Sequence, residues 1–313
     1  MIVDIHAHYH PARFNEALQA LGYPARFGGP VTDSAQHLSE RLEMMDAANV
    51  GLQILSPAAG HAPYGADERL SVEAARLAND LTAELVSRHP TKFKALISLP
   101  LPHIDASLRE LRRGYDELGF IGVNIHCSAL NRSTAEEEFE PIYEEINRRN
   151  GLIFYHPAGN AACSPLIADY GLGGAMGTSV EDAVIAAHLV GRRMPSKYPN
   201  ITYVIPHLGG PIAMLLERMN NQFSMRQHEL PEPPSVTLKR FYYDTVGHAS
   251  HAALLCAWKA YGAEHIVPGS DFPVLVAFET YARTFEWIRE VEEIPTTDRE
   301  QILEKSAPAI LNL

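Results

Sequence analysis

Several features are missing from this 313-residue sequence, and each absence excludes a class of protein. No stretch approaches the roughly 18 consecutive apolar residues of a membrane-spanning helix. The N-terminus carries Asp4 and lacks the basic segment that opens an export signal. We therefore expect no membrane partner and a cytoplasmic location.

Runs of lysine and arginine are missing as well. The formal net charge is −12, from 38 acidic and 26 basic side chains. A protein that binds nucleic acid needs clustered positive charge, so we expect no nucleic-acid partner. A few well-placed arginines can still bind a small anion, so a carboxylate substrate stays open.

Cysteine is scarce, and the three that occur, Cys127, Cys163 and Cys256, contain no Cys-x-x-Cys pair. We expect them to be reduced thiols rather than a disulfide framework or a thiolate metal site. Histidine is abundant by contrast, with 15 residues. The position of these histidines along the predicted strands is the most informative feature of the sequence.

Short, β-rich apolar runs alternate with longer segments of helical spacing, which is typical of βα units around a parallel sheet. The expected strands are residues 1–6, 51–56, 93–99, 120–126, 152–156, 201–207, 241–245 and 265–270. The expected helices between and after them include 34–48, 67–88, 106–118, 136–149, 179–191, 211–219, 250–261 and 277–291. Eight units in a chain of this length predict the α/β class and a (β/α)8 TIM barrel, with one domain over residues 1–313.

Two insertions distort this regular pattern, one after the first strand (11–33) and one after the fifth (159–177). Both contain glycine and proline. The loops that follow the strands build the active site of a TIM barrel. We therefore expect both insertions to form walls of a pocket.

The first strand carries His6 and His8, separated only by Ala7. Side chains alternate along a strand, so residues two apart point the same way and can reach one object together. Two imidazoles on one face supply half of a coordination shell for Zn²⁺ or a similar ion. An isolated pair of this kind is more often part of an ordinary amphipathic strand.

Three further strand ends carry the same kinds of residue. His156 ends the fifth strand, His207 the sixth and Asp271 the eighth. Each alone is an ordinary polar residue at a strand end, but in a closed barrel the ends meet at one mouth. Together they have the composition of a site for one Zn²⁺ or another divalent ion such as Mn²⁺, with a position left for water or substrate.

These motifs resemble the amidohydrolase superfamily, and within it the branch typified by α-amino-β-carboxymuconate-ε-semialdehyde decarboxylase. The resemblance extends from Asp4 to about Asn312 and includes His6-Ala7-His8, His156-Pro157, His207-Leu208-Gly209-Gly210 and Gly269-Ser270-Asp271-Phe272-Pro273. It implies four ligands for one metal ion, normally zinc: His6, His8, His156 and Asp271. It also implies that His207 is a general base acting on metal-bound water, and that Asp271 can carry a proton.

The resemblance suggests further residues for substrate binding. An arginine at the position of Arg218 reaches across a dimer interface in these decarboxylases to bind a substrate carboxylate, which implies a homodimer or higher oligomer; a solvated surface arginine is the alternative. Tyr64 and His248 follow the second and seventh strands, and we expect both at the mouth. Phe272 packs either beside an unsaturated or aromatic substrate or in the core.

The reaction implied by the whole pattern is decarboxylation of an unsaturated or aromatic carboxylic acid, such as a carboxymuconate semialdehyde or a hydroxybenzoate. The alternatives are a hydrolase of lactones or amides and a hydratase, because both use one metal, one water and one base. A barrel that only binds metal or a partner is a third possibility. A purely structural zinc site would be closed and would need no unligated His207.

Overall fold

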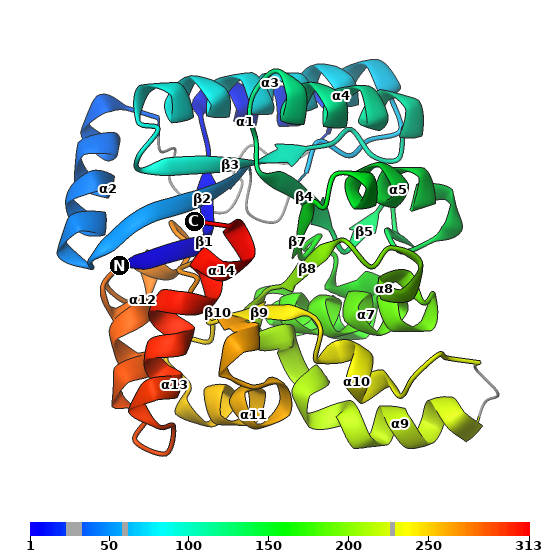
Figure 1. Ribbon diagram of the computed structural model, residues 1–313. Helices are drawn as coiled ribbons and strands as arrows, with labels where there is room; N and C mark the ends of the chain where they lie inside the picture. The colour runs from blue at the N-terminus through cyan, green and yellow to red at the C-terminus, as the bar shows by residue number, and fades with distance from the viewer. Residues whose placement is uncertain (23–32, 58–61, 226–228) are drawn as a thin grey trace.

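Eight parallel strands form the centre of the molecule (Figure 1). The computed structural model describes residues 1–22, 33–57, 62–225 and 229–313. Neighbouring strands follow one another in chain order around the sheet. They are β1 (Ile2–Tyr9), β2 (Val50–Pro57), β3 (Phe93–Ser98), β4 (Gly122–His126), β7 (Leu152–His156), β8 (Thr202–Ile205), β9 (Tyr242–Asp244) and β10 (Ile266–Val267).

Backbone hydrogen bonds close the sheet between its last and first strands. The amide of Ile5 donates to the carbonyl of Pro268 over 2.9 Å, and the amide of Asp271 donates to the carbonyl of His6 over 2.8 Å. The amide of His8 donates to the carbonyl of Phe272. The predicted (β/α)8 barrel is thereby confirmed, and the segment that carries Asp271 is bonded directly to the strand that carries both histidines.

The inside of the barrel is packed with branched and aromatic side chains contributed by most of its strands. This inner core includes Val3, Ile5, Ile54, Phe154 and Val204, all almost fully buried. Helix α14 (Ser306–Leu311) packs against it through Ala307, with Ile310 and Leu311 partly buried beside it. The C-terminal helix therefore seals the end of the barrel opposite the strand ends that carry the histidines.

Helices surround the barrel and bury a second, larger core against the outside of the strands (Figure 1). In α3 the residues facing the barrel recur at helical spacing, as in Ala74, Ala78, Leu81 and Leu85, and the side chain of Asp67 caps the first turn. The helices are α1 (Ala12–Ala20), α2 (Ala35–Ala47), α3 (Glu68–Arg88), α4 (Ile104–Asp116), α5 (Glu140–Arg148), α6 (Pro165–Ala168), α7 (Thr178–Gly191), α8 (Met194–Lys197), α9 (Leu216–Met225), α10 (Pro234–Leu238), α11 (His251–Tyr261), α12 (Arg283–Glu286), α13 (Thr296–Glu300) and α14. A two-residue hairpin, β5 (Ser128–Ala129) with β6 (Arg132–Ser133), follows β4.

The prediction of a single helix over residues 277–291 was wrong. The structure instead has a turn at Leu275–Ala277, the short helix α12 and a further turn at Trp287–Glu290. Phe278 is exposed at the pocket, whereas Tyr281 is buried beside Asp4. Residues three apart share one face of a helix, so a single regular helix could not place these two side chains in such different surroundings.

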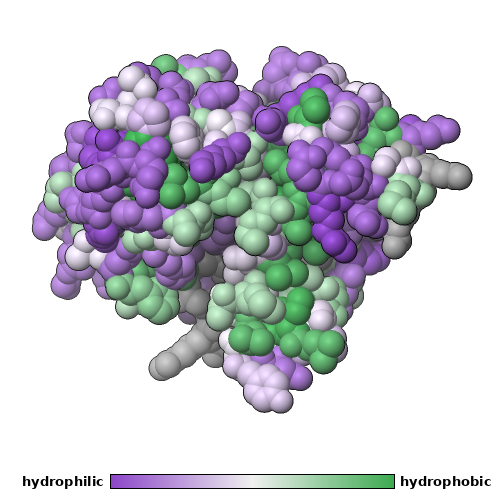
Figure 2. All heavy atoms as spheres, turned by 90° about the horizontal axis from the view of Figure 1, so that it is seen from below, coloured by the Kyte–Doolittle hydropathy of each residue, from purple (hydrophilic) through white to green (hydrophobic). Residues whose placement is uncertain are grey.

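The two insertions differ in structure. The first contains α1, and its residues 23–32 lie outside the described part of the chain. The second, 159–177, is a series of short turns around α6. Figure 2 shows the face seen from below, where apolar residues gather towards the middle and hydrophilic residues surround them. No helix in the described ranges has the length and apolar character needed to cross a lipid bilayer.

Candidate active site

Four potential metal ligands lie together at the carboxyl ends of the strands. One ligand atom from each of His6, His8, His156 and Asp271 lies within 4.8 Å of the others. The Nε2 atoms of His6 and His8 are 3.1 Å apart, and Oδ1 of Asp271 lies 3.3 Å from the first and 3.1 Å from the second. All four residues are buried.

A break in the pairing of β1 helps to place its two histidines in this cluster. The register with β2 shifts between Ile2 and Val3 and again between Asp4 and Ala7. Before the second shift, Val3 packs in the inner core; within it, the ring of His6 lies 4.8 Å from that of Phe154, a member of the same core. Apolar side chains and then histidines can therefore face the barrel axis along one strand, which strict alternation would not allow.

Each imidazole is oriented by a second hydrogen bond. Nδ1 of His6 lies 2.7 Å from Oδ2 of Asp244, and Nδ1 of His156 lies 3.0 Å from the carbonyl of Pro157. Nδ1 of His8 lies 2.9 Å from the hydroxyl of Ser56. Because a carboxylate or carbonyl can only accept, Nδ1 of His6 and of His156 carries a proton, and Nε2 is left as the atom that would bind a metal ion.

This arrangement fits a divalent metal ion. Ligand atoms about 2.0–2.2 Å from a tetrahedral ion are separated from one another by slightly more than 3 Å, as the Nε2 and Oδ1 atoms here are. Burial lowers the pKa of His8 and, more strongly, that of His156, so both imidazoles stay neutral and able to bind metal. Burial opposes the charged form of Asp271, but His6 and His207 outweigh it and hold the Asp271 pKa well below its ordinary value.

His207 lies beside the four-residue cluster without being part of it. Its Nε2 is 3.9 Å from Oδ2 of Asp271, and its Nδ1 is 2.8 Å from Oδ2 of Asp182 on α7. Burial opposes the charged form of His207, but Asp182 outweighs it and raises the pKa of the imidazole well above the ordinary value. Burial raises the pKa of Asp182 to about 6.

The backbone at two of these residues is strained. His207 has φ 52° and Asp271 has φ 51°, both in the left-handed region that non-glycine residues rarely adopt. The amide of His207 donates to Oδ1 of Asp244 over 2.8 Å. Since the other carboxylate oxygen of Asp244 binds His6, this one side chain fixes both a cluster histidine and the position of His207.

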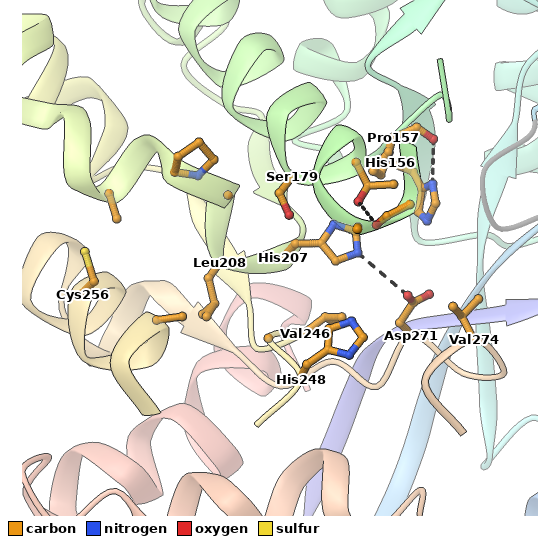
Figure 3. Close-up of a pocket in the computed structure, with 18 of the residues that line it drawn as sticks. His156, Pro157, Ser179, His207, Leu208, Val246, His248, Cys256, Asp271 and Val274 are labelled. Carbon is orange, nitrogen blue, oxygen red and sulfur yellow. Dashed lines mark hydrogen bonds and ion pairs between the residues drawn. The ribbon is translucent and has the colours of Figure 1, made fainter. Parts of the chain in front are cut away.

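A pocket of about 1000 Å³ opens beside the cluster (Figure 3). His156 and Asp271 lie on one side of it, His207 lies in the middle, and Leu208 and Cys256 lie on the opposite side. The second insertion contributes Gly159, Gly174 and Ala175 to its lining. The insertion after the fifth strand of the barrel therefore forms a wall of the pocket, as expected, whereas no described residue between 9 and 22 lines it.

The four residues expected to bind substrate are not brought together. His248 lines the pocket, in contact with the exposed ring of Phe278. Tyr64 is buried, and its hydroxyl accepts a hydrogen bond from the amide of His126. Phe272 is buried beneath the guanidinium of Arg41, 4.5 Å from its ring centre, and Arg218 is exposed on α9. Within this chain, neither Tyr64, Phe272 nor Arg218 lines the pocket.

Three residues that orient the site, Asp182, Asp244 and Ser56, were not assigned roles from the sequence. Asp244 and Ser56 lie at strand ends, so the signal that identified the histidines also applies to them. Asp182 lies in the first turns of α7 and carries no comparable signal. Only the folded chain shows that α7 places this carboxylate behind His207.

Comparisons with known proteins agree with this geometry. Gamma-resorcylate decarboxylase from a Polaromonas species is 28% identical over 84% of this chain and 83% of its own length. 2-Amino-3-carboxymuconate-6-semialdehyde decarboxylase from Dictyostelium discoideum is 23% identical over 99% and 91%. These relatives are decarboxylases by name.

Solved structures show the same fold. That of 2,6-dihydroxybenzoate decarboxylase in complex with 2,6-dihydroxybenzoate matches with a TM-score of 0.80 at 22% identity, covering 100% of this chain and 99% of the other. Dihydroxybenzoic acid decarboxylase from Polaromonas, solved with manganese and 2-nitroresorcinol, also has a TM-score of 0.80 at 22% identity, covering 100% and 97%. The amidohydrolase family model matches residues 3–313, and the chain therefore belongs to the amidohydrolase family.

Proposed function

We propose that this protein is a decarboxylase that uses one divalent metal ion to release CO₂ from an aromatic or unsaturated carboxylic acid. The observation that carries the proposal is the convergence of His6, His8, His156 and Asp271 beside an unligated His207. A closed structural site would have no use for a histidine backed by its own carboxylate. The names of the relatives favour decarboxylation over hydrolysis or hydration.

The four clustered residues would hold the metal ion. Bound there, the ion would supply positive charge for the substrate carboxylate or a neighbouring oxygen. Imidazole and carboxylate ligands accept both Zn²⁺ and Mn²⁺. We favour Zn²⁺. Mn²⁺ is the alternative, and it is supported by a related structure that contains manganese.

His207 would manage the proton. When the bond between the substrate and its carboxylate breaks, the electron pair stays on carbon, CO₂ leaves, and one proton must replace it. Asp182 accepts a hydrogen bond from Nδ1–H of His207 and stabilises the imidazolium, whose Nε2–H lies on the pocket side and can donate the proton. Oδ2 of Asp271, 3.9 Å from that Nε2, would relay or share the proton.

The direct test is a substrate panel of carboxymuconate semialdehydes, hydroxybenzoates and lactones, followed by CO₂ release and by ultraviolet absorbance with the metal-loaded protein. We expect CO₂ from one of the carboxylic acids. Opening of a lactone, or addition of water without CO₂, would instead assign the protein to the hydrolases or hydratases of the family.

A variant separates metal binding from proton transfer. We expect His207→Asn to keep its metal content and to lose at least about 100-fold in kcat, the usual size of a general acid–base contribution. The matched control is His37→Asn, because His37 is exposed on α2. Equal turnover by His207→Asn and the parent protein would remove His207 from the reaction.

The proposal also covers the oligomeric state, the location and the domain organisation of the protein. We infer a homodimer or higher oligomer in the cytoplasm, formed from one-domain chains, with Arg218 contributing to the neighbouring pocket. What supports the last point is that Arg218 is exposed on α9 and lies outside the pocket lining of its own chain.

A further inference from the structure

The pocket has two chemically different ends. Its buried end carries His156 and Asp271, and His207 lies between them and the opposite side (Figure 3). The opposite side is formed by Leu208 and Cys256, and Ala253 of α11 lines it one turn before Cys256. A substrate whose carboxylate lies at the buried end would therefore extend along an apolar surface.

The rim continues this apolar character. Met214 is 76% exposed and Phe278 is 73% exposed, yet both line the pocket. Large apolar side chains left this exposed beside a cavity are typical of ligand-binding grooves. They extend the apolar surface from Leu208 and Cys256 towards solvent.

Positive charge is missing from the same wall. Among the described residues that line the pocket there is no lysine and no arginine. His248, which lines the pocket but is not one of the four clustered residues, is exposed and packed against the ring of Phe278. A second carboxylate on the substrate would have to give up water here without gaining a strong ionic partner, which is costly.

The size of the pocket also favours a substrate larger than a single ring with one carboxylate. Its volume of about 1000 Å³ lies at the upper end of the range common for small-molecule sites. A single ring with one carboxylate leaves much of this volume empty. An apolar group attached to the ring would gain binding energy in proportion to the area it buries.

We propose that the substrate is an aromatic monocarboxylic acid that carries an apolar substituent, such as an alkyl chain, placed along Leu208 and Cys256. This inference rests on the proposed decarboxylase function and narrows its substrate class. It disfavours dicarboxylic substrates, including the carboxymuconate semialdehydes: the described lining of this chain offers no second anion site, and Arg218, which we propose reaches the pocket from a neighbouring subunit, would be paired with the reacting carboxylate.

The test compares matched substrates with the metal-loaded full-length protein. We compare the kcat/KM values of hydroxybenzoates that carry hydrogen, methyl, propyl, pentyl or carboxymethyl at one ring position. The series is then repeated for each of the other ring positions. At the best position we expect propyl to exceed hydrogen by about 10-fold or more, the usual effect of added methylenes in an apolar pocket. We expect carboxymethyl to fall below hydrogen; a preference for carboxymethyl over propyl at every position would overturn the inference.

A binding measurement keeps this test independent of turnover. The alkylphenols that decarboxylation would produce are titrated by calorimetry, and we expect the same order of affinity. If no acid releases CO₂ but the alkylphenols bind in that order, the decarboxylase function fails and the apolar pocket stands. If hydroxybenzoates react but alkyl groups improve neither kcat/KM nor affinity, the function stands and the inference fails.

Variants of Cys256 test whether the apolar substituent of the substrate lies along this side of the pocket. Cys256→Asp places a carboxylate on the apolar side and should reduce the propyl-to-hydrogen ratio to near one, whereas Cys256→Val should keep it. Cys163→Asp is the matched control, because Cys163 is exposed and does not line the pocket. An unchanged ratio in a folded Cys256→Asp protein would place the substituent elsewhere and overturn this part of the inference.

Discussion

The carboxylate of Asp182 lies 2.8 Å from Nδ1 of His207 and accepts its proton in a hydrogen bond. We expect Asp182→Asn to lower kcat by about 100-fold or more, because the amide can also stabilise the wrong tautomer of His207. Metal content should not change. Loss of the negative charge also destabilises the imidazolium, so the limb of the pH–rate profile that reports His207 should move to lower pH. A profile identical to that of the parent protein would refute the role of Asp182.

The side chain of Asp244 binds Nδ1 of His6 and the amide of His207 through its two oxygens. Removing a carboxylate that orients a histidine ligand typically weakens metal binding by about 10- to 100-fold. We expect this loss for Asp244→Asn, measured by competition with a chelator of known affinity. Asp298→Asn is the control, because that carboxylate accepts a hydrogen bond from Trp258. Equal metal affinity in both variants would contradict the prediction.

Arg218 offers a test of the proposed oligomer. If it binds substrate in the pocket of a neighbouring subunit, Arg218→Gln should raise KM. A 1:1 mixture with inactive His207→Asn should then regain about a quarter of parent activity, because half of the dimers are mixed and each has one intact site. Recovery after mixing and reassociation is measured against each variant alone. An unchanged KM would exclude Arg218 from the site.

The surroundings of Glu145 predict how the free energy of unfolding depends on pH in acid. Its carboxylate accepts hydrogen bonds from Arg148 and Arg149, which hold its pKa at about 2, below the ordinary 4.5. The charged form is thus favoured by folding, and its contribution is present above about pH 4.5 and lost as pH falls towards 2. We expect Glu145→Gln to cost about 1–2 kcal/mol of unfolding free energy at pH 7.

Denaturant unfolding at several pH values checks this dependence. The difference between Glu145→Gln and the parent should shrink steadily between pH 4.5 and pH 2. Glu300→Gln, at an exposed glutamate of α13, should show a small difference at every pH. A difference in unfolding free energy that stays constant as pH falls would show that the Glu145 side chain stabilises the fold by packing rather than by charge.

The sequence predicted the barrel and the cluster because both depend on short-range patterns. His6, His156 and Asp271 each end an apolar run, and parallel strands bring such ends to one mouth. Asp182 could not be found in this way, because its role depends on how α7 packs behind His207. The broken helix after residue 277 was missed for a related reason: Phe278 turns to the pocket and Tyr281 to the buried Asp4.

The position of α14 has a practical consequence. It seals the barrel at the end remote from the pocket, and the N-terminal amine lies 3.6 Å from Oε2 of Glu304, just before this helix. The first and last parts of the chain therefore lie near one another, away from the mouth (Figure 1). The molecule can be tethered to a solid support through either end with its mouth facing the solution, so an immobilised catalyst should keep full access to substrate.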